Sequence, residues 1–338
     1  MKQDYFKYIN STKIFSNKKL WFLINKKIGH NGFVTSLTVG KTQSGAPLLI
    51  SGGRDKNAIV WKLNLDDRRE IVDAENKVVD HVVGKPFKAL HGHNHFVSCV
   101  GVHSSNNHFF SGSWDRTLRL WDLTKFTTHQ RFQGHTKDVL SLALTCGDRL
   151  LVSGAMDNTV RIWDLAGNVQ HTIEEFGGWV SSIKKIQNGK DTSLAIGSWD
   201  NTVGIYDAEY SRNRTLTNYD YGVTAMDVDS SGNFLFVGSK NGVVNLWELS
   251  ETEETKEKKS IDTGAPLHAL SYNDKYVQYV FAGTQKGFGV YDITTGKSVA
   301  EYSTPGTSCL SIAWDANNNY IFTGCSDGRI RVYKVNDQ

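Results

Sequence analysis

One sequence pattern recurs seven times along the 338 residues and constrains the fold more than any other feature. Each copy has an apolar pair, a Ser/Gly-rich segment, an acidic or amide residue, an alternating apolar segment and a closing aromatic. The closing aromatics are Trp61, Trp121, Trp163, Tyr206, Trp247, Tyr291 and Tyr333, about 42 residues apart except for one interval of 60. This period is typical of a four-stranded propeller blade. The sequence therefore predicts an all-β, seven-bladed propeller.

A turn residue precedes each closing aromatic by six positions. These residues are Asp55, Asp115, Asp157, Asp200, Asn241, Gln285 and Asp327. Asp and Asn favour turns because their side chains bond nearby backbone N–H groups. We therefore expect each of them in the turn between the second and third strands of a blade, which we name the BC turn.

The ring needs one insertion and one closing strand. The interval of 60 residues predicts an insertion at about 64–85, between the first two blades, where the chain is polar and lacks the repeat. The apolar stretch at about 19–27 is the expected outermost strand of the last blade, which removes an open sheet edge. We thus expect an N-terminal extension at 1–18 and a single propeller domain at 19–338.

Composition and motifs exclude several classes of protein. The net charge of +3 excludes a bulk polycation but allows a local basic patch. The longest apolar run has five residues, too short for a transmembrane helix, and the N-terminus lacks the apolar core of a signal peptide. Four scattered cysteines form no C-x-x-C pair, so no metal is expected and a cytoplasmic, reducing location is the default.

No phosphate-binding, hydrolase or metalloprotease motif is found, so we expect neither an enzyme nor a cofactor nor a small-molecule substrate.

The first three repeats each contain a His, a Ser, an Asp and a Trp. The sets are His30, Ser51, Asp55 and Trp61; His93, Ser111, Asp115 and Trp121; and His135, Ser153, Asp157 and Trp163. His, Ser and Asp could form a hydrolase triad. Three near-identical copies argue against that, because an enzyme needs one site. Since a buried indole N–H, hydroxyl and imidazole all need partners, we expect structural tetrads.

The spacing from Gly29-His30 to Trp61, from Gly92-His93 to Trp121 and from Gly134-His135 to Trp163 resembles the WD40 repeat. Within that superfamily, the segments SGGRDKNAIVWKL and SGSWDRTLRLWDLT resemble the receptor for activated C kinase, the Gβ-like scaffold of the small ribosomal subunit. The resemblance is strong up to about Asp164 and looser afterwards. It implies a WD40 β-propeller that scaffolds proteins rather than catalysing a reaction.

Basic residues gather in the loops of the first three repeats. The candidates for binding the ribosome and its rRNA are Arg54, Lys56, Arg116, Lys137 and His91. We expect Arg54 and Lys56 to splay outward on either side of Asp55, a geometry suited to phosphate. The resemblance implies that this Arg-Asp-Lys turn is the main ribosome anchor. The third repeat has Met156-Asp157-Asn158 where the family has Arg-Asp-Lys, so its contribution should be weaker or shifted.

Tyr276 falls where the family has a tyrosine implicated in kinase contact; the alternative is an aromatic at a strand edge.

The resemblance implies binding to the small ribosomal subunit through the rRNA backbone and ribosomal proteins, in the cytoplasm. Protein kinases and translation factors would bind elsewhere on the ring, and no membrane contact is implied. One alternative is a substrate adaptor, such as that of a ubiquitin ligase. Another is a G-protein β-like subunit, which needs a coiled-coil helix; about 28 residues precede the first repeat and contain no heptads.

Overall fold

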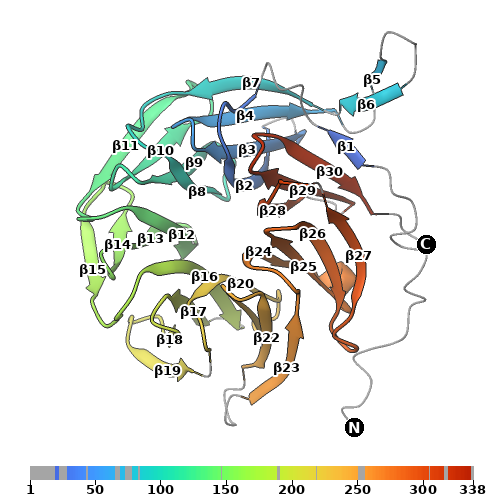
Figure 1. Cartoon of the computed structure of the whole chain (residues 1–338). Helices are drawn as coiled ribbons and strands as arrows, with labels where there is room; N and C mark the ends of the chain where they lie inside the picture. The colour runs from blue at the N-terminus through green and yellow to red at the C-terminus, as the bar shows by residue number, and fades with distance from the viewer. Residues whose placement is uncertain are drawn as a thin grey trace.

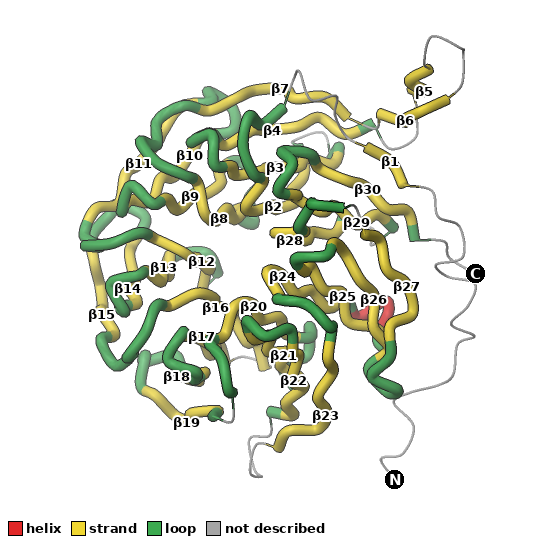
Figure 2. Tube along the Cα trace, viewed as in Figure 1, coloured by secondary structure: helices red, strands yellow, loops and turns green. Residues whose placement is uncertain are grey.

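Seven sheets of mainly antiparallel strands are arranged like blades around a central axis (Figure 1). The computed structural model describes residues 20–22, 29–42, 45–64, 69–72, 78–82, 84–145, 147–188, 191–217, 219–249, 256–303, 305–315 and 319–335. Strands make up nearly all of the regular structure, and one short 3-10 helix, η1 (Asp274–Tyr276), is found among these residues (Figure 2). The predicted all-β, seven-bladed propeller is confirmed.

Each blade has four strands, named below in order from the axis outward. Blade 1 contains β2 (Val34–Lys41), β3 (Pro47–Gly53), β4 (Ala58–Leu63) and β7 (Gly84–Leu90). Blade 2 contains β8 (Val97–Val102), β9 (His108–Ser113), β10 (Thr117–Asp122) and β11 (Thr127–Gln133). Blade 3 contains β12 (Val139–Thr145), β13 (Leu150–Ala155), β14 (Val160–Asp164) and β15 (Val169–Ile173).

The remaining blades follow the same order. Blade 4 contains β16 (Val180–Asn188), β17 (Asp191–Ser198), β18 (Val203–Tyr206) and β19 (Arg212–Leu216). Blade 5 contains β20 (Val223–Val228), β21 (Phe234–Ser239), β22 (Val243–Glu248) and β23 (Lys256–Asp262). Blade 6 contains β24 (Leu267–Tyr272), β25 (Tyr279–Thr284), β26 (Gly287–Asp292) and β27 (Ser298–Ser303). Blade 7 contains β28 (Cys309–Trp314), β29 (Tyr320–Cys325), β30 (Ile330–Lys334) and β1 (Leu20–Phe22).

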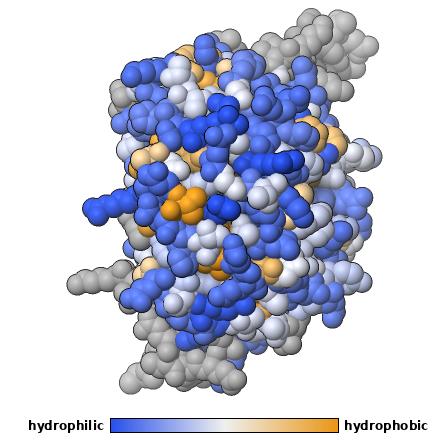
Figure 3. All heavy atoms as spheres, turned by 90° about the vertical axis from the view of Figure 1, so that its left-hand side faces the viewer, coloured by the Kyte–Doolittle hydropathy of each residue, from blue (hydrophilic) through white to orange (hydrophobic). Residues whose placement is uncertain are grey.

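The core lies between neighbouring blades. Ile50 and Val60 of blade 1 belong to the same buried cluster as Val97, Phe109 and Trp121 of blade 2. Alternate side chains of a strand point to opposite faces, so each sheet packs against both of its neighbours. The outer side of the ring over β11 and β15 is mostly hydrophilic (Figure 3).

Hydroxyl groups near the axis join successive blades. Ser98 Oγ donates to the carbonyl of Val139 in the next blade (2.6 Å), and Ser181 Oγ donates to that of Val223 (2.5 Å). Thr35 makes the equivalent bond from blade 1 to blade 2. These bonds fix the relative height of the innermost strands, because each hydroxyl needs its acceptor opposite.

The N-terminal strand β1 pairs antiparallel with β30, with Leu20 opposite Tyr333. It lies within the stretch expected to close the ring; residues 19 and 23–27 fall outside the described part of the chain. The insertion forms a hairpin of β5 (Arg69–Val72) and β6 (Val78–Val82), and Phe22 pairs with Val82 in parallel. The insertion therefore widens the sheet of blade 7 to six strands (Figure 1).

The BC turn of blade 6 differs from the sequence prediction. In blade 1 the N–H of Arg54, just before Asp55, donates to Phe33 O (2.9 Å). In blade 6 the equivalent bond runs from Gln285 N to Pro266 O (2.9 Å), so Gln285 corresponds to Arg54 and not to Asp55. The placement of Gln285 at the Asp position was wrong, because this turn is one residue shorter and Gly287 already pairs with Thr284.

Candidate functional site

Hydrogen bonds join the four tetrad residues in each of blades 1 to 3. In blade 1, Trp61 Nε1 donates to Ser51 Oγ (2.7 Å), which lies 2.7 Å from His30 Nε2, and His30 Nδ1 lies 2.9 Å from the Asp55 carboxylate. The indole can only donate, so the Ser hydroxyl oxygen accepts from it, and the imidazole joins this hydroxyl at Nε2 to the Asp carboxylate at Nδ1. Blades 2 and 3 repeat these contacts within 3.2 Å.

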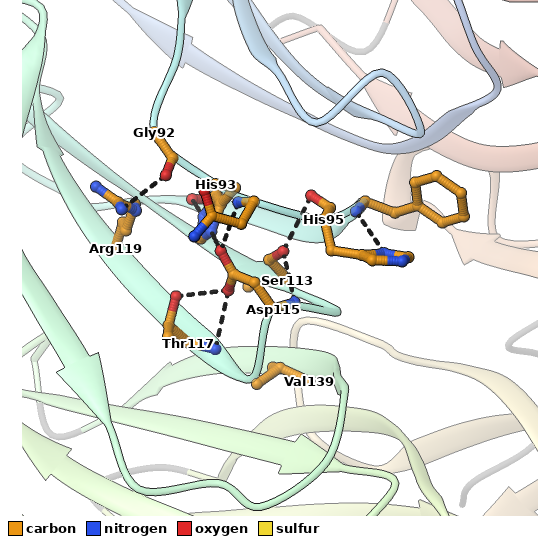
Figure 4. A network of polar contacts seen from close by, with 12 residues as sticks. Gly92, His93, His95, Ser113, Asp115, Thr117, Arg119 and Val139 are labelled. Carbon is orange, nitrogen blue, oxygen red and sulfur yellow. Dashed lines mark hydrogen bonds and ion pairs between the residues drawn. The ribbon is translucent and has the colours of Figure 1, made fainter.

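The tetrad carboxylate also fixes two loops. In blade 2, Asp115 accepts from the backbone N–H of Asn94 (2.9 Å) and of Thr117 (3.1 Å), besides His93 (2.8 Å), as Figure 4 shows for His93 and Thr117. Asn94 belongs to the loop from the outermost strand of one blade to the innermost strand of the next, which we name the DA loop. Asp115 therefore ties the DA loop to the BC turn on one rim of the ring.

These contacts perturb the ionisation of the tetrads. Burial raises the pKa of Asp115, but the hydrogen bond and the charge of His93 outweigh it and hold that pKa well below its usual value. Burial lowers the pKa of His93. The three Ser hydroxyls are fully buried, and each contacts both an indole and an imidazole. A substrate has no access to them, so the arrangement serves structure.

Two basic residues occupy a strained backbone position on this rim. The residue after the turn Asp has a positive φ: 70° at Lys56 and 69° at Arg116. The same position holds Asn158, Asn201, Gly242 and Gly328 in blades 3, 4, 5 and 7. Asn and Gly adopt the left-handed region at lower cost than Lys or Arg. Blades 1 and 2 therefore place a cation where the backbone favours a small residue.

Arg54 does not splay outward as expected. Its guanidinium lies over the ring of Phe33 (4.3 Å) and near Phe96 (5.4 Å), facing the mouth of the central channel. Arg54 points this way because its planar cation gains favourable contact with the two aromatic faces. Lys56 is exposed on the other side of Asp55.

The other basic candidates lie close to this turn or further along the rim. His91 Nδ1 lies 2.7 Å from Asn57 Oδ1, so the DA loop of blade 2 contacts the BC turn of blade 1. Lys137 is exposed in the DA loop of blade 3. The structure thus places all five candidates on one rim, with Arg54, Lys56 and His91 around the first BC turn.

Sequence reasoning missed an aromatic cluster at the channel mouth. A cavity of about 450 Å³ there is lined by Phe96, Trp114, Trp179 and Trp199, among others. Trp179 and Trp199 stack with their centroids 4.7 Å apart. The sequence does contain a signal for this cluster. The residue just before each turn Asp faces the channel, and this residue is Trp in blades 2 and 4.

Tyr276 is not at a strand edge and does not present its ring to solvent. It lies in η1, is 7% exposed, and stacks on Trp314 with the centroids 5.4 Å apart. The ring is therefore part of the core between blades 6 and 7, and the possible kinase contact at Tyr276 stays a prediction.

No group of three or more metal-ligating side chains comes together among the described residues. Within the same residues, no helix is both long enough and apolar enough to cross a membrane.

Comparison with known proteins places the chain in a family. The family model described as "WD domain, G-beta repeat" matches residues 21–62, 84–122, 126–164, 211–248 and 296–334. The chain is 33% identical over 323 residues to the small ribosomal subunit protein RACK1y of Oryza sativa subsp. japonica, covering 91% of this chain and 94% of that protein. It is 31% identical over 323 residues to MST50-interacting protein 11 of Pyricularia oryzae, covering 91% and 95%. The chain is therefore a member of the WD-repeat family and a homologue of RACK1y.

Proposed function

We propose that this protein is a non-catalytic scaffold that docks on the small ribosomal subunit through the rim of blades 1 to 3. The observation that carries the proposal is the pair of cations, Lys56 and Arg116, in the left-handed position that other blades fill with Asn or Gly. A residue kept in a costly conformation points to a role for its side chain. The name of the rice homologue, a small ribosomal subunit protein, supports the same assignment.

The chemistry of the rim suits an RNA backbone. Lys56 and Arg116 project from turns that Asp55 and Asp115 hold rigid, and His91 lies beside the first of them. Fixed cations bind phosphate with little loss of conformational freedom, and the release of counterions makes such binding salt-dependent. Helical RNA is recognised mainly by shape and by its backbone, which a rigid basic rim can match.

The rest of the ring would then remain free for other partners while the protein is bound to the ribosome in the cytoplasm. Protein kinases and translation factors are the classes that the resemblance implies. In this role the propeller links signalling to translation by holding proteins near the ribosome, and it needs no catalytic group.

Co-sedimentation in sucrose gradients tests the proposal. Wild type should sediment with small subunits at low salt and dissociate as the salt is raised. The double variant Arg54→Asp/Lys56→Glu should stay at the top of the gradient at both salt concentrations. Lys125→Glu is the matched control, since Lys125 is exposed in the turn at the far end of β10 from Arg116 and should not affect binding. Association of the double variant equal to that of wild type would refute the proposed docking rim.

The aromatic channel mouth favours a second candidate, a peptide-reading adaptor that works without the ribosome. Its cavity of about 450 Å³ lies in the size range of ligand sites. If neither wild type nor variant associates with small subunits, this candidate replaces the first, and Trp199→Ala should then weaken peptide capture.

A further inference from the structure

Blades 2, 3 and 4 each place an arginine beside the aromatic that closes the blade. In blade 2, Arg119 lies 5.7 Å from the Trp121 ring and donates to Gly92 O in the DA loop (2.8 Å). Arg161 in blade 3 has the same strand position, and its Nη1 lies with the Trp163 ring beside Gly134, as Arg119 Nη1 lies with Trp121 beside Gly92. Arg331 in blade 7 also has this strand position, but its guanidinium binds Asp327 instead. In blade 4 this position is Gly204, and Arg212 reaches the place from the outermost strand instead, 5.4 Å from Tyr206.

Blade 6 has small residues at both positions that supply these arginines. Gly289 pairs with the outermost strand as Gly204 does in blade 4, and Ser298 stands opposite Tyr291 as Arg212 stands opposite Tyr206. A cavity of about 280 Å³ lies here, lined by Gly289, Tyr291 and Ser298, among others. This volume greatly exceeds the roughly 10–15 Å³ that one water needs.

The cavity contains an equivalent of the one acidic residue that contacts the arginine in blade 4, and a second acidic residue besides. There, Glu175 of the DA loop lies 3.4 Å from Arg212 Nε and accepts from the Tyr206 hydroxyl (3.2 Å). The equivalent residue in blade 6 is Asp262, and Glu301 adds a second carboxylate to the lining. Lys286 also lines the cavity, but its ammonium is bonded to Gly264 O (2.8 Å). Two carboxylates against one ammonium leave the site net negative.

The negative charge of the site affects the pKa of Tyr291, the aromatic that closes blade 6. Burial, followed by the charges of Glu301 and Asp262, raises the pKa of Tyr291 to about 12. Its hydroxyl donates to Thr263 O (3.3 Å), which holds the ring along one wall of the cavity. An aromatic face beside two carboxylates is a favourable environment for a planar guanidinium.

We propose that the blade 6 cavity is a binding site for an arginine side chain of a partner protein. The guanidinium would take the place that Arg212 has in blade 4, beside Tyr291, with Asp262 and Glu301 as its counter-charges. Glu301 and Ser298 are exposed, so the side chain can enter from solvent. This site lies outside blades 1 to 3, and the inference does not depend on docking to the ribosome.

Binding of short labelled peptides to the full-length protein tests this site by fluorescence anisotropy. The probe is a Gly-Gly-Arg-Gly-Gly peptide, and its partner contains citrulline, which keeps the shape and lacks the charge. We expect at least about tenfold tighter binding of the arginine peptide, since two carboxylates face the cation. Equal binding of the two peptides, or no saturable binding of either, overturns the proposal.

Two sets of variants locate the binding. Ser298→Arg copies Arg212 of blade 4 and should fill the cavity with the protein's own guanidinium, abolishing the preference for arginine, whereas Ser298→Gln should retain part of it. Asp262→Asn/Glu301→Gln should weaken binding several-fold and adds no bulk, so it carries the test if Ser298→Arg fails to fold. Glu209→Gln, an exposed acid in a turn of blade 4, is the control. Unchanged binding by the folded Ser298→Arg or by the neutralised pair overturns the assignment, as does binding of inorganic phosphate alone.

Discussion

Blades 1 to 3 and blades 4 and 7 hold the Asp of the BC turn with different chemistry. In the first group a buried His holds the turn Asp through a tetrad. In blade 7 the same carboxylate is held by Arg331, whose Nη2 lies 2.7 Å from Asp327 Oδ2. In blade 4, Asp200 accepts from Gly177 N (2.8 Å) and from Thr202. The comparison shows that the ring needs the turn, whereas the tetrad is one of several ways to hold it.

The interior of blade 4 is correspondingly apolar. In blade 4 the positions of His and Ser are taken by Phe176 and Ile196, and Phe176 packs 6.1 Å from Tyr206. These two apolar side chains fill the interior of the blade in place of the His and Ser of the tetrad. They leave no buried hydroxyl or imidazole that needs a hydrogen-bond partner. Mutations should therefore have different costs in the two groups.

The largest difference is expected at the turn residue itself. Asp115→Ala removes the acceptor of His93, Asn94 and Thr117 and should cost about 3–5 kcal/mol, because partly buried donors lose a charged acceptor. Asn241→Ala in blade 5 removes an acceptor of Val243 N (3.2 Å) and should cost about 1 kcal/mol. Thermal unfolding of both variants measures this contrast, and equal losses would contradict it.

A reciprocal exchange sharpens the comparison. Ile196→Ser places the hydroxyl of blades 1 to 3 into blade 4, where Phe176 stands in place of the His. We expect a loss of about 2–4 kcal/mol, since buried apolar surface is removed and a polar group is added without its imidazole. The double variant Ile196→Ser/Phe176→His should recover part of this loss. A single variant as stable as wild type would show that the hydroxyl finds another partner.

Acid should weaken blades 1 to 3, and also blade 7, where burial is outweighed by the hydrogen bond and charge of Arg331, which lower the pKa of Asp327. Asp55, Asp115 and Asp157 have lowered pKa values in the folded protein, where His contacts outweigh the effect of burial. The unfolded chain therefore binds more protons at low pH, so this stabilisation is complete above about pH 5 and is lost as the pH falls. The lowered pKa of His93, caused by burial, acts in the same direction below about pH 6.5.

Hydrogen exchange measures this effect blade by blade. At pH 7 the backbone amides of blades 1 to 3 should exchange more slowly than those of blade 5, which has Asn241 and no acid at this position. The difference in exchange rate between blades 1 to 3 and blade 5 should become smaller at pH 4. Faster exchange in blades 1 to 3 at pH 7 would contradict the stabilising role of the tetrads.

The sequence predicts the features that depend on residue type and period. The closing aromatics define seven blades, and the bonding needs of Trp61, Ser51 and His30 predict their contact. It does not predict the direction of Arg54, because the attraction of Phe33 and Phe96 arises only after two blades have packed. The sequence does not predict the shorter BC turn at Gln285, because Gln has no turn preference that would fix its position within the turn. The pairing of the insertion with β1 joins segments far apart in the chain, which a local pattern cannot reveal.

The proposed docking role rests on two cations that occupy an unfavourable backbone conformation. One pair of substitutions tests their cost to stability and their contribution to binding separately. The double variant Lys56→Asn/Arg116→Asn gives blades 1 and 2 the residue found in blades 3 and 4. Its thermal stability should be equal to wild type or higher by about 0.5–1 kcal/mol, since Asn tolerates the left-handed region better. Its affinity for small subunits should fall, and the slope of log affinity against log salt should decrease by about 2, one for each lost phosphate contact. A variant that is equally stable and binds small subunits with unchanged affinity and salt dependence would contradict the proposed function.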